Sequence, residues 1–326
     1  MSRSKVAPAY AQAGVTASRF RCLLDEQPTY LVPHRLLADE TATVDGELVF
    51  NPECWLDGPP REPLMSSGGL PSWVADADLW VRDPPTSMIL PFWMDATWRA
   101  ALFEMQAGTP APRTWPRHML AVLQQAGVLI ERSQAARSRT GWRQALADGA
   151  EMLKDGYARL GGLIHPYYIG ALRRHYRFLL RHGVFTSGDD QSERRAVYHN
   201  EPVARFFHQQ LTPAVSQMAG EAVKPSYAYV VTYREGAELA SHVDREQCEY
   251  TITLAVDQTP EPGVEFAWPL YLETEQGRIT VFQAIGDGLL FRGRQLPHGR
   301  DRLANGCTST SILFHYVPAG FQGPLD

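Results

Sequence analysis

The chain has 326 residues, of which 44% are hydrophobic, so it is long enough to form two domains, or one elaborated domain, around a sizeable core. Its formal net charge of −5, with a pI near 6.1, argues against a nucleic-acid-binding protein, which would carry a basic domain. The four cysteines have no Cys-x-x-Cys spacing, which argues against a disulfide framework or a zinc knuckle and favours a reducing compartment; they are Cys22, Cys54, Cys248 and Cys307.

No apolar run in the sequence approaches the ~18 residues of a membrane span. The start of the chain also lacks the apolar core of a secretory signal peptide. We therefore expect a cytoplasmic protein with neither a membrane nor a nucleic acid as partner.

The first third of the chain carries few signals of regular structure. Residues 1–30 are interpreted as a loosely ordered arm, and residues 31–95 are irregular and rich in Pro and Trp. Within them Leu48–Phe50 is a candidate strand, whereas Pro59–Pro63 and Ser66–Pro71 have the composition of turns or linkers.

Helical character begins near Asp95. This residue is a suitable N-cap for a helix over Ala96–Gln106. A second helix is predicted between Thr114 and Gly127, where apolar side chains recur at helical spacing, and a short apolar strand follows at 128–130. We therefore expect a mostly helical N-terminal extension over residues 1–150.

Residues 140–183 are expected to hold helices that support the second half of the chain. Pro166 fits the first turn of such a helix, and Gly183 would end it. Its basic cluster Arg173–Arg177 is interpreted as a solvated face. His175 and His182 are seven residues apart on one face and could bind a metal, although half-buried helix histidines are the more common case.

Strands dominate the sequence after residue 225. Apolar or aromatic side chains alternate with polar ones in several segments, as on the two faces of a sheet. The predicted strands are Ser226–Tyr233, Cys248–Val256, Thr280–Ala284 and Thr308–Val317. A turn is predicted at Gly286–Gly288.

A His-x-Asp pair follows the first of these strands. His242 and Asp244 would share one face of a strand, because alternate side chains point the same way. His298, far along the chain, could complete a three-ligand set. Two histidines and one carboxylate leave about three of six octahedral positions open, which is the arrangement of non-haem Fe(II) oxygenases. His315, on the last predicted strand, is interpreted as a packed or hydrogen-bonded histidine.

These elements together resemble the 2-oxoglutarate/Fe(II)-dependent dioxygenases of the prolyl-4-hydroxylase-like branch. The resemblance covers roughly residues 155–318. It is carried by Asp155–Leu160, by the Tyr-x-x-Gly stretch at 233–236, by His242-Val-Asp244, and by the run from Gly286-Asp-Gly288 to Pro297-His298.

The resemblance implies an α+β protein. Its catalytic core would be a double-stranded β-helix (jelly roll) with supporting helices, over residues 151–326. Residues 1–150 would be an extension that is either structural or on the substrate side. The family implies Fe(II) held by His242, Asp244 and His298, and 2-oxoglutarate as co-substrate that chelates the iron through its 1-carboxylate and 2-oxo group.

One position departs from the family pattern. The family anchors the far carboxylate of 2-oxoglutarate with an Arg or Lys on the last strand, where this chain has Gly306–Ser309 and no cation. We expect Arg300 to anchor this carboxylate instead, because it shares a strand face with His298 and a guanidinium is a natural bidentate partner of a carboxylate. Arg302, one step further along that face, is the second choice. For either arginine, a solvated hairpin charge is the alternative.

Hydroxyl groups could add hydrogen bonds to the same carboxylate; the candidates are Tyr233, Thr253 and Thr308. The sequence thus favours a dioxygenase that uses Fe(II), 2-oxoglutarate and O2, with ascorbate as a candidate reductant. It would hydroxylate an aliphatic C–H of an amino-acid, peptide or natural-product substrate and release succinate and CO2. The alternative is a non-catalytic, cupin-like binding protein that retains a metal site.

Overall fold

The computed structural model describes residues 20–24, 47–56, 58–61, 64, 70–189, 191–261 and 268–326. Most of the arm expected over residues 1–30, and the segment Ser66–Pro71 apart from its last two residues, lie outside the described residues. The chain divides into two compact units. The larger contains Ala145–Leu163 and Arg173–Asp326, and the smaller contains Ala17–Gln144 and Ile164–Leu172.

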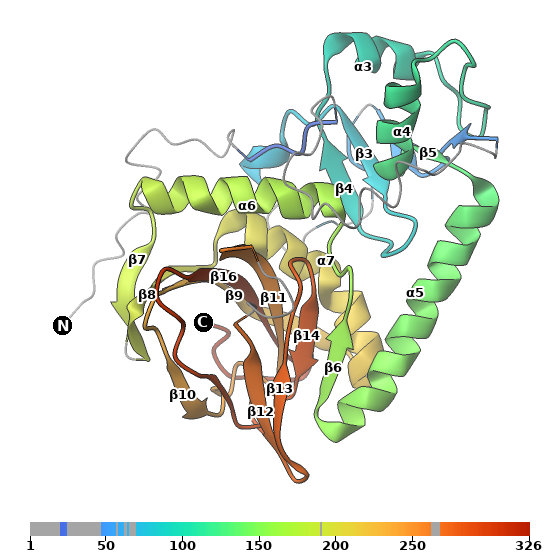
Figure 1. The fold of residues 1–326 in the computed structure, drawn as a ribbon. Helices are drawn as coiled ribbons and strands as arrows, with labels where there is room; N and C mark the ends of the chain where they lie inside the picture. The colour runs from blue at the N-terminus through green and yellow to red at the C-terminus, as the bar shows by residue number, and fades with distance from the viewer. Residues whose placement is uncertain are drawn as a thin grey trace. The chain divides into compact units, whose positions relative to one another are not determined.

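The larger unit is built on two antiparallel sheets (Figure 1). The seven-stranded sheet has the order β6 (Tyr157–Leu160), β14 (Gly288–Phe291), β11 (Tyr250–Thr259), β16 (Thr308–Pro318), β9 (Val223–Arg234), β8 (Ser192–His199) and β7 (Thr186–Asp189). The four-stranded sheet has the order β10 (Leu239–His242), β15 (His298–Arg300), β12 (Leu270–Thr274) and β13 (Gly277–Val281).

From β9 to β16 the chain passes repeatedly between these sheets. Strands β9, β11, β14 and β16 belong to the larger sheet, and β10, β12, β13 and β15 to the smaller. Eight strands shared between two sheets in this way have the connectivity of a jelly roll. The predicted α+β class with an antiparallel core is therefore confirmed. The strand predicted at Thr280–Ala284 forms earlier, as β13, and ends at Val281.

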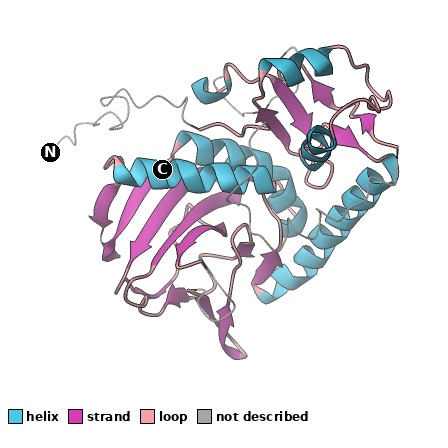
Figure 2. Cartoon of the chain, turned by 45° about the horizontal axis from the view of Figure 1, so that its top comes forward, coloured by secondary structure: helices cyan, strands magenta, loops and turns pink. Residues whose placement is uncertain are grey.

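Strand β16 lies at the centre of the larger sheet, between β11 and β9. Its alternation separates two environments. Ile312, Phe314 and Tyr316 are buried, and the rings of Phe314 and Tyr316 pack against His208 of helix α7 (Pro202–Ala219). The helices of this unit lie along the outer face of the sheet (Figures 1 and 2). Ser311, Leu313 and His315 point to the opposite face and line a cavity.

The smaller unit holds more strand than expected. A three-stranded antiparallel sheet is formed by β2 (Cys54–Trp55), β3 (Leu79–Arg82) and β4 (Ile89–Phe92), and β1 (Val49–Phe50) pairs with β5 (Leu129–Ile130). This unit also contains the helices α3 (Ala96–Phe103) and α4 (Arg117–Gln125) and the 3-10 turn η2 (Ser72–Val74). The mostly helical extension is therefore not confirmed. The sequence did not reveal β3 and β4 because these strands are short and almost wholly buried, so their residues do not alternate between apolar and polar.

Several local predictions in this region are confirmed. The carboxylate of Asp95 accepts hydrogen bonds from the backbone N–H groups of Thr97 and Trp98 at 2.7 and 2.9 Å, which is an N-cap for α3. That helix ends at Phe103 rather than at Gln106. The strands expected at Leu48–Phe50 and at 128–130 form as β1 and β5.

Two further helices are α5 (Arg132–Met152) and α6 (Pro166–Arg181). Helix α5 leads through η3 (Leu153–Asp155) into β6, and α6 begins at Pro166 as expected. No helix in the described ranges is long and apolar enough to cross a membrane. All four cysteines fall in those ranges and none forms a disulfide.

The interpretation of Arg173–Arg177 as a solvated face is wrong. Arg173 is only 2% exposed and its guanidinium pairs with Asp257 at 3.0 Å and with Glu261 at 2.6 Å. Arg177 pairs with the same Asp257 at 2.5 Å. A helical spacing of four residues places both arginines over one carboxylate of β11, so the charges hold the helix on the sheet.

We expect Asp257→Asn to lower the free energy of unfolding by about 3 kcal/mol, because it removes one partner of a buried ion pair. Glu261→Gln is the matched control. The Glu261 side chain is 59% exposed, so its loss should cost less than about 1 kcal/mol. Urea unfolding followed by circular dichroism measures both, and equal small effects would contradict this account of the cluster.

Candidate metal centre

Three candidate metal ligands converge on one point of the larger unit. His242 ends β10, and His298 begins β15, and the two residues are cross-strand partners. Asp244 Oδ1 lies 3.8 Å from His242 Nε2 and 3.6 Å from His298 Nε2. The imidazole centroids are 4.5 Å apart. His242 and His298 are 56 positions apart in the chain, yet the two histidines and Asp244 present their donor atoms together.

The local backbone differs from the expected strand. Strand β10 ends at His242, and Asp244 lies in the connection to β11, so the two do not share a strand face. The backbone N–H of Asp244 donates to the Gly293 carbonyl at 2.8 Å, which fixes this connection. The carboxylate reaches the histidines through the turn of the chain rather than through strand alternation.

Both imidazoles are oriented for metal binding. His242 Nδ1 lies 2.9 Å from the Ala240 carbonyl oxygen, and His298 Nδ1 lies 3.0 Å from that of Leu296. A carbonyl only accepts, so each Nδ1 carries the proton and each Nε2 offers its lone pair to the centre. Burial lowers the pKa of His298, which favours the neutral form that a metal needs.

The donor set fits divalent iron. Bonds of about 2.1 Å at right angles require donor atoms about 3.0 Å apart. The separations of 3.6 and 3.8 Å are closed by side-chain shifts of less than about 1 Å. Two imidazoles and one carboxylate on one side of the metal are the ligand set of non-haem Fe(II) sites.

A second group, Asp244, Cys248 and His315, also has donor atoms close together. It is less suited to a metal. The Thr251 hydroxyl lies between Asp244 Oδ2 and His315 Nδ1, at 2.8 and 3.0 Å. Burial raises the pKa of the Cys248 thiol to about 12, so the thiolate that would bind is disfavoured. His315 is buried and hydrogen-bonded, as expected, and burial lowers its pKa to about 4.

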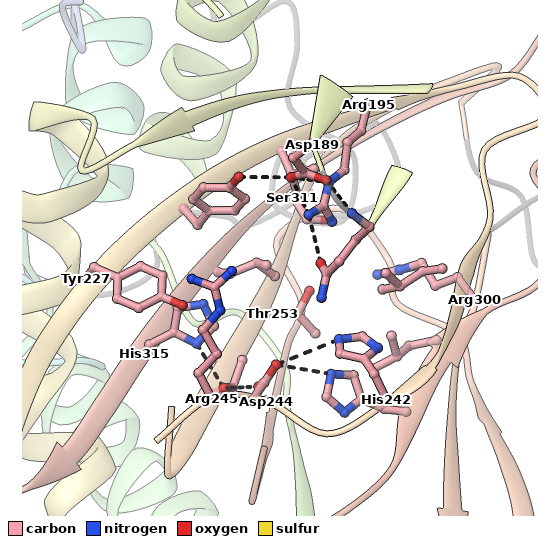
Figure 3. Close-up of a pocket in the computed structure, with 18 of the residues that line it drawn as sticks. Asp189, Arg195, Tyr227, His242, Asp244, Arg245, Thr253, Arg300, Ser311 and His315 are labelled. Atoms are coloured by element: carbon pink, nitrogen blue, oxygen red, sulfur yellow. Dashed lines mark hydrogen bonds and ion pairs between the residues drawn. The ribbon is translucent and has the colours of Figure 1, made fainter. Parts of the chain in front are cut away.

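The centre opens into a cavity between the two sheets (Figure 3). Arg300, Thr253 and Tyr233 all line it, as do His242, Asp244 and His298. Arg302 and Thr308 are exposed and are not among its lining residues. The expectation that Arg302 continues the face of Arg300 is wrong, because β15 ends at Arg300 and the alternation stops there.

Arg300 is a buried cation with no paired acid in the described part of the chain. It is 5% exposed, donates one hydrogen bond to the Trp268 carbonyl, and lies 4.8 Å from the centroid of the Trp268 ring. Burial lowers the pKa of its guanidinium to about 10, so it remains charged at neutral pH. A buried charge of this kind requires a counter-ion, and the cavity is where one can enter.

Two hydroxyl groups that line the same cavity have unused hydrogen-bonding capacity. Thr253 Oγ1 is buried and has no hydrogen-bond partner among the residues that the structure describes. The Tyr233 hydroxyl oxygen accepts from Arg195 Nη1 at 3.2 Å, which leaves its own proton to donate. Buried polar groups are almost always paired, so an unpaired hydroxyl in a cavity wall points to a ligand.

A second buried arginine was not found from the sequence. Arg195 on β8 donates from Nε to both carboxylate oxygens of Asp189, at 2.8 and 2.7 Å. Burial alone would raise the pKa of Asp189, but the hydrogen bonds and charge of Arg195 lower it. Arg195 is therefore neutralised within the protein, unlike Arg300. No sequence signal marks this pair, because it depends on the β7–β8 hairpin.

The helix histidines do not form a metal site within the described residues. His175 is buried with Nε2 3.1 Å from Glu201. His182 is exposed, and its Nδ1 lies 2.8 Å from the Phe178 carbonyl of its own helix. These are the ordinary roles of helix histidines.

No family model and no curated protein matches the chain. Solved structures with a similar fold include a prolyl-4-hydroxylase from Pseudomonas putida, with 15% identity and a TM-score of 0.46 over 54% of this chain and 100% of that one. HygX from Streptomyces hygroscopicus, with nickel, 2-oxoglutarate and hygromycin B, has 14% identity and a TM-score of 0.44 over 54% and 88%. A prolyl hydroxylase from Trichoplax adhaerens, in complex with a peptide fragment, has 13% identity and a TM-score of 0.45 over 54% and 91%.

We expect alanine at His242, Asp244 or His298 to lower Fe(II) affinity by more than about tenfold, since each change removes a donor atom. Anaerobic titration with Fe(II) measures this. His182→Ala is the matched histidine control and should bind iron like the parent protein. Stoichiometric iron in the triple-alanine protein would show that the site lies elsewhere.

Proposed function

We propose that this protein is an Fe(II)- and 2-oxoglutarate-dependent dioxygenase that hydroxylates an aliphatic C–H group. The observation that carries the proposal is one cavity that contains both the two-histidine, one-carboxylate set and a buried arginine with no acidic partner among the described residues. The first would hold iron, and the second would hold the carboxylate of an organic acid beside it. We also propose the division into an extension (1–150) and a dioxygenase domain (151–326).

The reaction balances as R–H, 2-oxoglutarate and O2 giving R–OH, succinate and CO2. One oxygen atom enters the product and the other enters succinate, and the C1–C2 bond of 2-oxoglutarate breaks. Bound Fe(II) would supply the one-electron chemistry that O2 needs to react with a C–H bond. The fully protein-based ligand set leaves about three coordination positions for the small reactants.

Arg300 would bind the 5-carboxylate of 2-oxoglutarate. It lies two residues after His298 on β15, so the two side chains share a face and are about 6.6 Å apart along the strand. That separation suits a five-carbon diacid whose other end meets the metal. A guanidinium pairs with a carboxylate through two charge-assisted hydrogen bonds. Thr253 and Tyr233 would donate further hydrogen bonds from the cavity wall.

Arg195 is less suitable for this role. Its guanidinium already forms an ion pair with Asp189 and donates to Gln191 Oε1 at 2.7 Å and to Tyr233. A second carboxylate would have to displace this network and leave Asp189 without its partner. Breaking a buried ion pair in this way costs about 3 to 5 kcal/mol. Arg300 has no such competitor among the described residues.

The remaining cavity wall would face the substrate. Asp189, His199, Tyr229 and Arg245 line this part, and they suit a substrate with several polar groups. We propose an amino-acid, peptide or natural-product substrate, in a cytoplasmic enzyme for which ascorbate is a candidate reductant. Asp244 favours hydroxylation, because the related halogenases that the family contains lack this carboxylate.

Turnover should require all three small reactants. Candidate substrates incubated with Fe(II), 2-oxoglutarate and labelled O2 should gain one labelled oxygen atom, with one succinate released per product, as measured by mass spectrometry. Asp244→Gly should abolish hydroxylation while the protein remains folded. A substrate oxidised equally well without 2-oxoglutarate would refute the proposal, and binding without any turnover would favour the cupin-like alternative.

Arg300→Gln should retain iron but weaken 2-oxoglutarate binding by at least about tenfold, because a neutral amide replaces a charge-assisted bidentate partner. The measurement is a titration of the Fe(II)-loaded protein with 2-oxoglutarate, followed by calorimetry. Arg302→Gln is the matched control and should bind as the parent protein does. If Arg300→Gln binds 2-oxoglutarate normally and Arg195→Gln does not, the anchor is Arg195.

A further inference from the structure

We propose that Thr251, His315 and Gly293 are positioning residues that hold Asp244 so that only its Oδ1 faces the metal. This inference rests on the proposed iron centre and goes beyond it, because none of the three residues is a ligand. They lie on β11, on β16 and in the turn after β14, on the side of the Asp244 carboxylate away from His242 and His298.

The two oxygens of Asp244 have different environments. Oδ1 lies 3.8 and 3.6 Å from the Nε2 atoms of the two histidines. Oδ2 accepts a hydrogen bond from the Thr251 hydroxyl at 2.8 Å. Figure 3 shows these contacts running from the histidines through Asp244 towards His315. The carboxylate is therefore shared between a metal-facing oxygen and a protein-facing oxygen.

The direction of the hydrogen bonds follows from proton counting. The Thr251 hydroxyl has one proton, and a carboxylate oxygen can only accept, so that proton goes to Asp244. The Thr251 oxygen must then accept from His315 Nδ1, which lies 3.0 Å away. Thr251 and His315 are cross-strand partners in the β11–β16 ladder, so the backbone register sets this order.

Burial makes the chain of hydrogen bonds hard to replace with water. Thr251 is 2% exposed and His315 is 4% exposed. The His315 ring is also held by the Tyr227 ring, with centroids 4.5 Å apart. Loss of this hydroxyl would leave Asp244 Oδ2 and His315 Nδ1 buried without a hydrogen-bond partner, which would destabilise the folded protein.

Gly293 lies against the Oδ2 atom of the carboxylate. A Cβ atom at this position would stand 2.2 Å from Asp244 Oδ2 and 2.8 Å from both Thr251 Oγ1 and the Cys248 carbonyl oxygen. Its carbonyl also accepts the Asp244 N–H at 2.8 Å. The absence of a side chain is thus what lets Asp244 sit against Thr251.

The arrangement serves the proposed reaction by keeping the carboxylate monodentate. Of six octahedral positions on a bound iron, the two histidines and one Asp244 oxygen would take three. The 1-carboxylate and 2-oxo group of 2-oxoglutarate would take two, which would leave one for O2. A carboxylate bound through both oxygens would occupy a position that the small reactants require. Holding Oδ2 on Thr251 prevents this.

The test compares Thr251→Val, which loses only the hydroxyl, with Thr251→Ser, which keeps it. We expect Thr251→Val to lower Fe(II) affinity about 10- to 100-fold, as for other groups that orient a metal ligand, and to change the visible spectrum of the Co(II)-substituted protein, which reports coordination number. Thr251→Ser should remain within about threefold of the parent in affinity and keep its Co(II) spectrum.

Thr232→Val is the matched control, because Thr232 on β9 also makes a buried hydroxyl contact, with Thr310 at 2.8 Å, and does not line the cavity. It should leave iron affinity and the Co(II) spectrum unchanged. Parent-like iron binding and Co(II) spectrum in Thr251→Val would overturn the inference while leaving the proposed centre intact. Failure of the parent protein to bind Fe(II) would overturn both.

If Thr251→Val does not fold, His315→Gln and His315→Leu decide the question. The glutamine amide can donate to Thr251, and leucine cannot. The inference requires the leucine variant to bind iron at least about tenfold more weakly than the glutamine variant. Equal affinities would overturn it.

Discussion

The cross-strand pairing of His242 with His298 is the constraint on which the rest of the site depends. Both residues lie on the four-stranded sheet, and between Leu239 and His242 the register with β15 shifts by one residue. This bulge, of a kind common beside active sites, turns both imidazoles to the cavity. The backbone carbonyls of Ala240 and Leu296 then fix the tautomers. The position of Asp244, opposite them, and of Arg300, further along β15, follows from this pairing.

Among the described residues of the larger unit, three arginines are buried, and they show how neutralisation separates structural from binding roles. Arg173 is held by Asp257 and Glu261, and Arg195 by Asp189. In each such pair the attraction between the opposite charges offsets the free energy of burying them. The pair therefore links two elements of the fold and needs no ligand. Arg300 has only a carbonyl and an indole ring beside it in the described part of the chain. The same side chain therefore becomes a candidate for anion binding where its counter-ion must come from outside.

Much of the core was predictable because its signals are local. Alternation identified β9, β11 and β16, and strand parity placed Arg300 on the face of His298. The same parity argument was wrong for Arg302, because hydrogen bonding in β15 ends at Arg300, and for Asp244, because β10 ends at His242. Where a strand stops is decided by its neighbours, which a single sequence does not reveal. The Arg195–Asp189 pair and the short strands β3 and β4 were missed for the same reason, since both depend on tertiary pairing.

A crystal structure of the protein with Fe(II) and 2-oxoglutarate, grown without oxygen, tests the proposed site most directly. We expect one metal ion bound at about 2.0 to 2.2 Å by His242 Nε2, Asp244 Oδ1 and His298 Nε2, with the 5-carboxylate of 2-oxoglutarate paired to Arg300. A metal bound by Asp244, Cys248 and His315, or a 2-oxoglutarate carboxylate paired with Arg195 and not with Arg300, would contradict it.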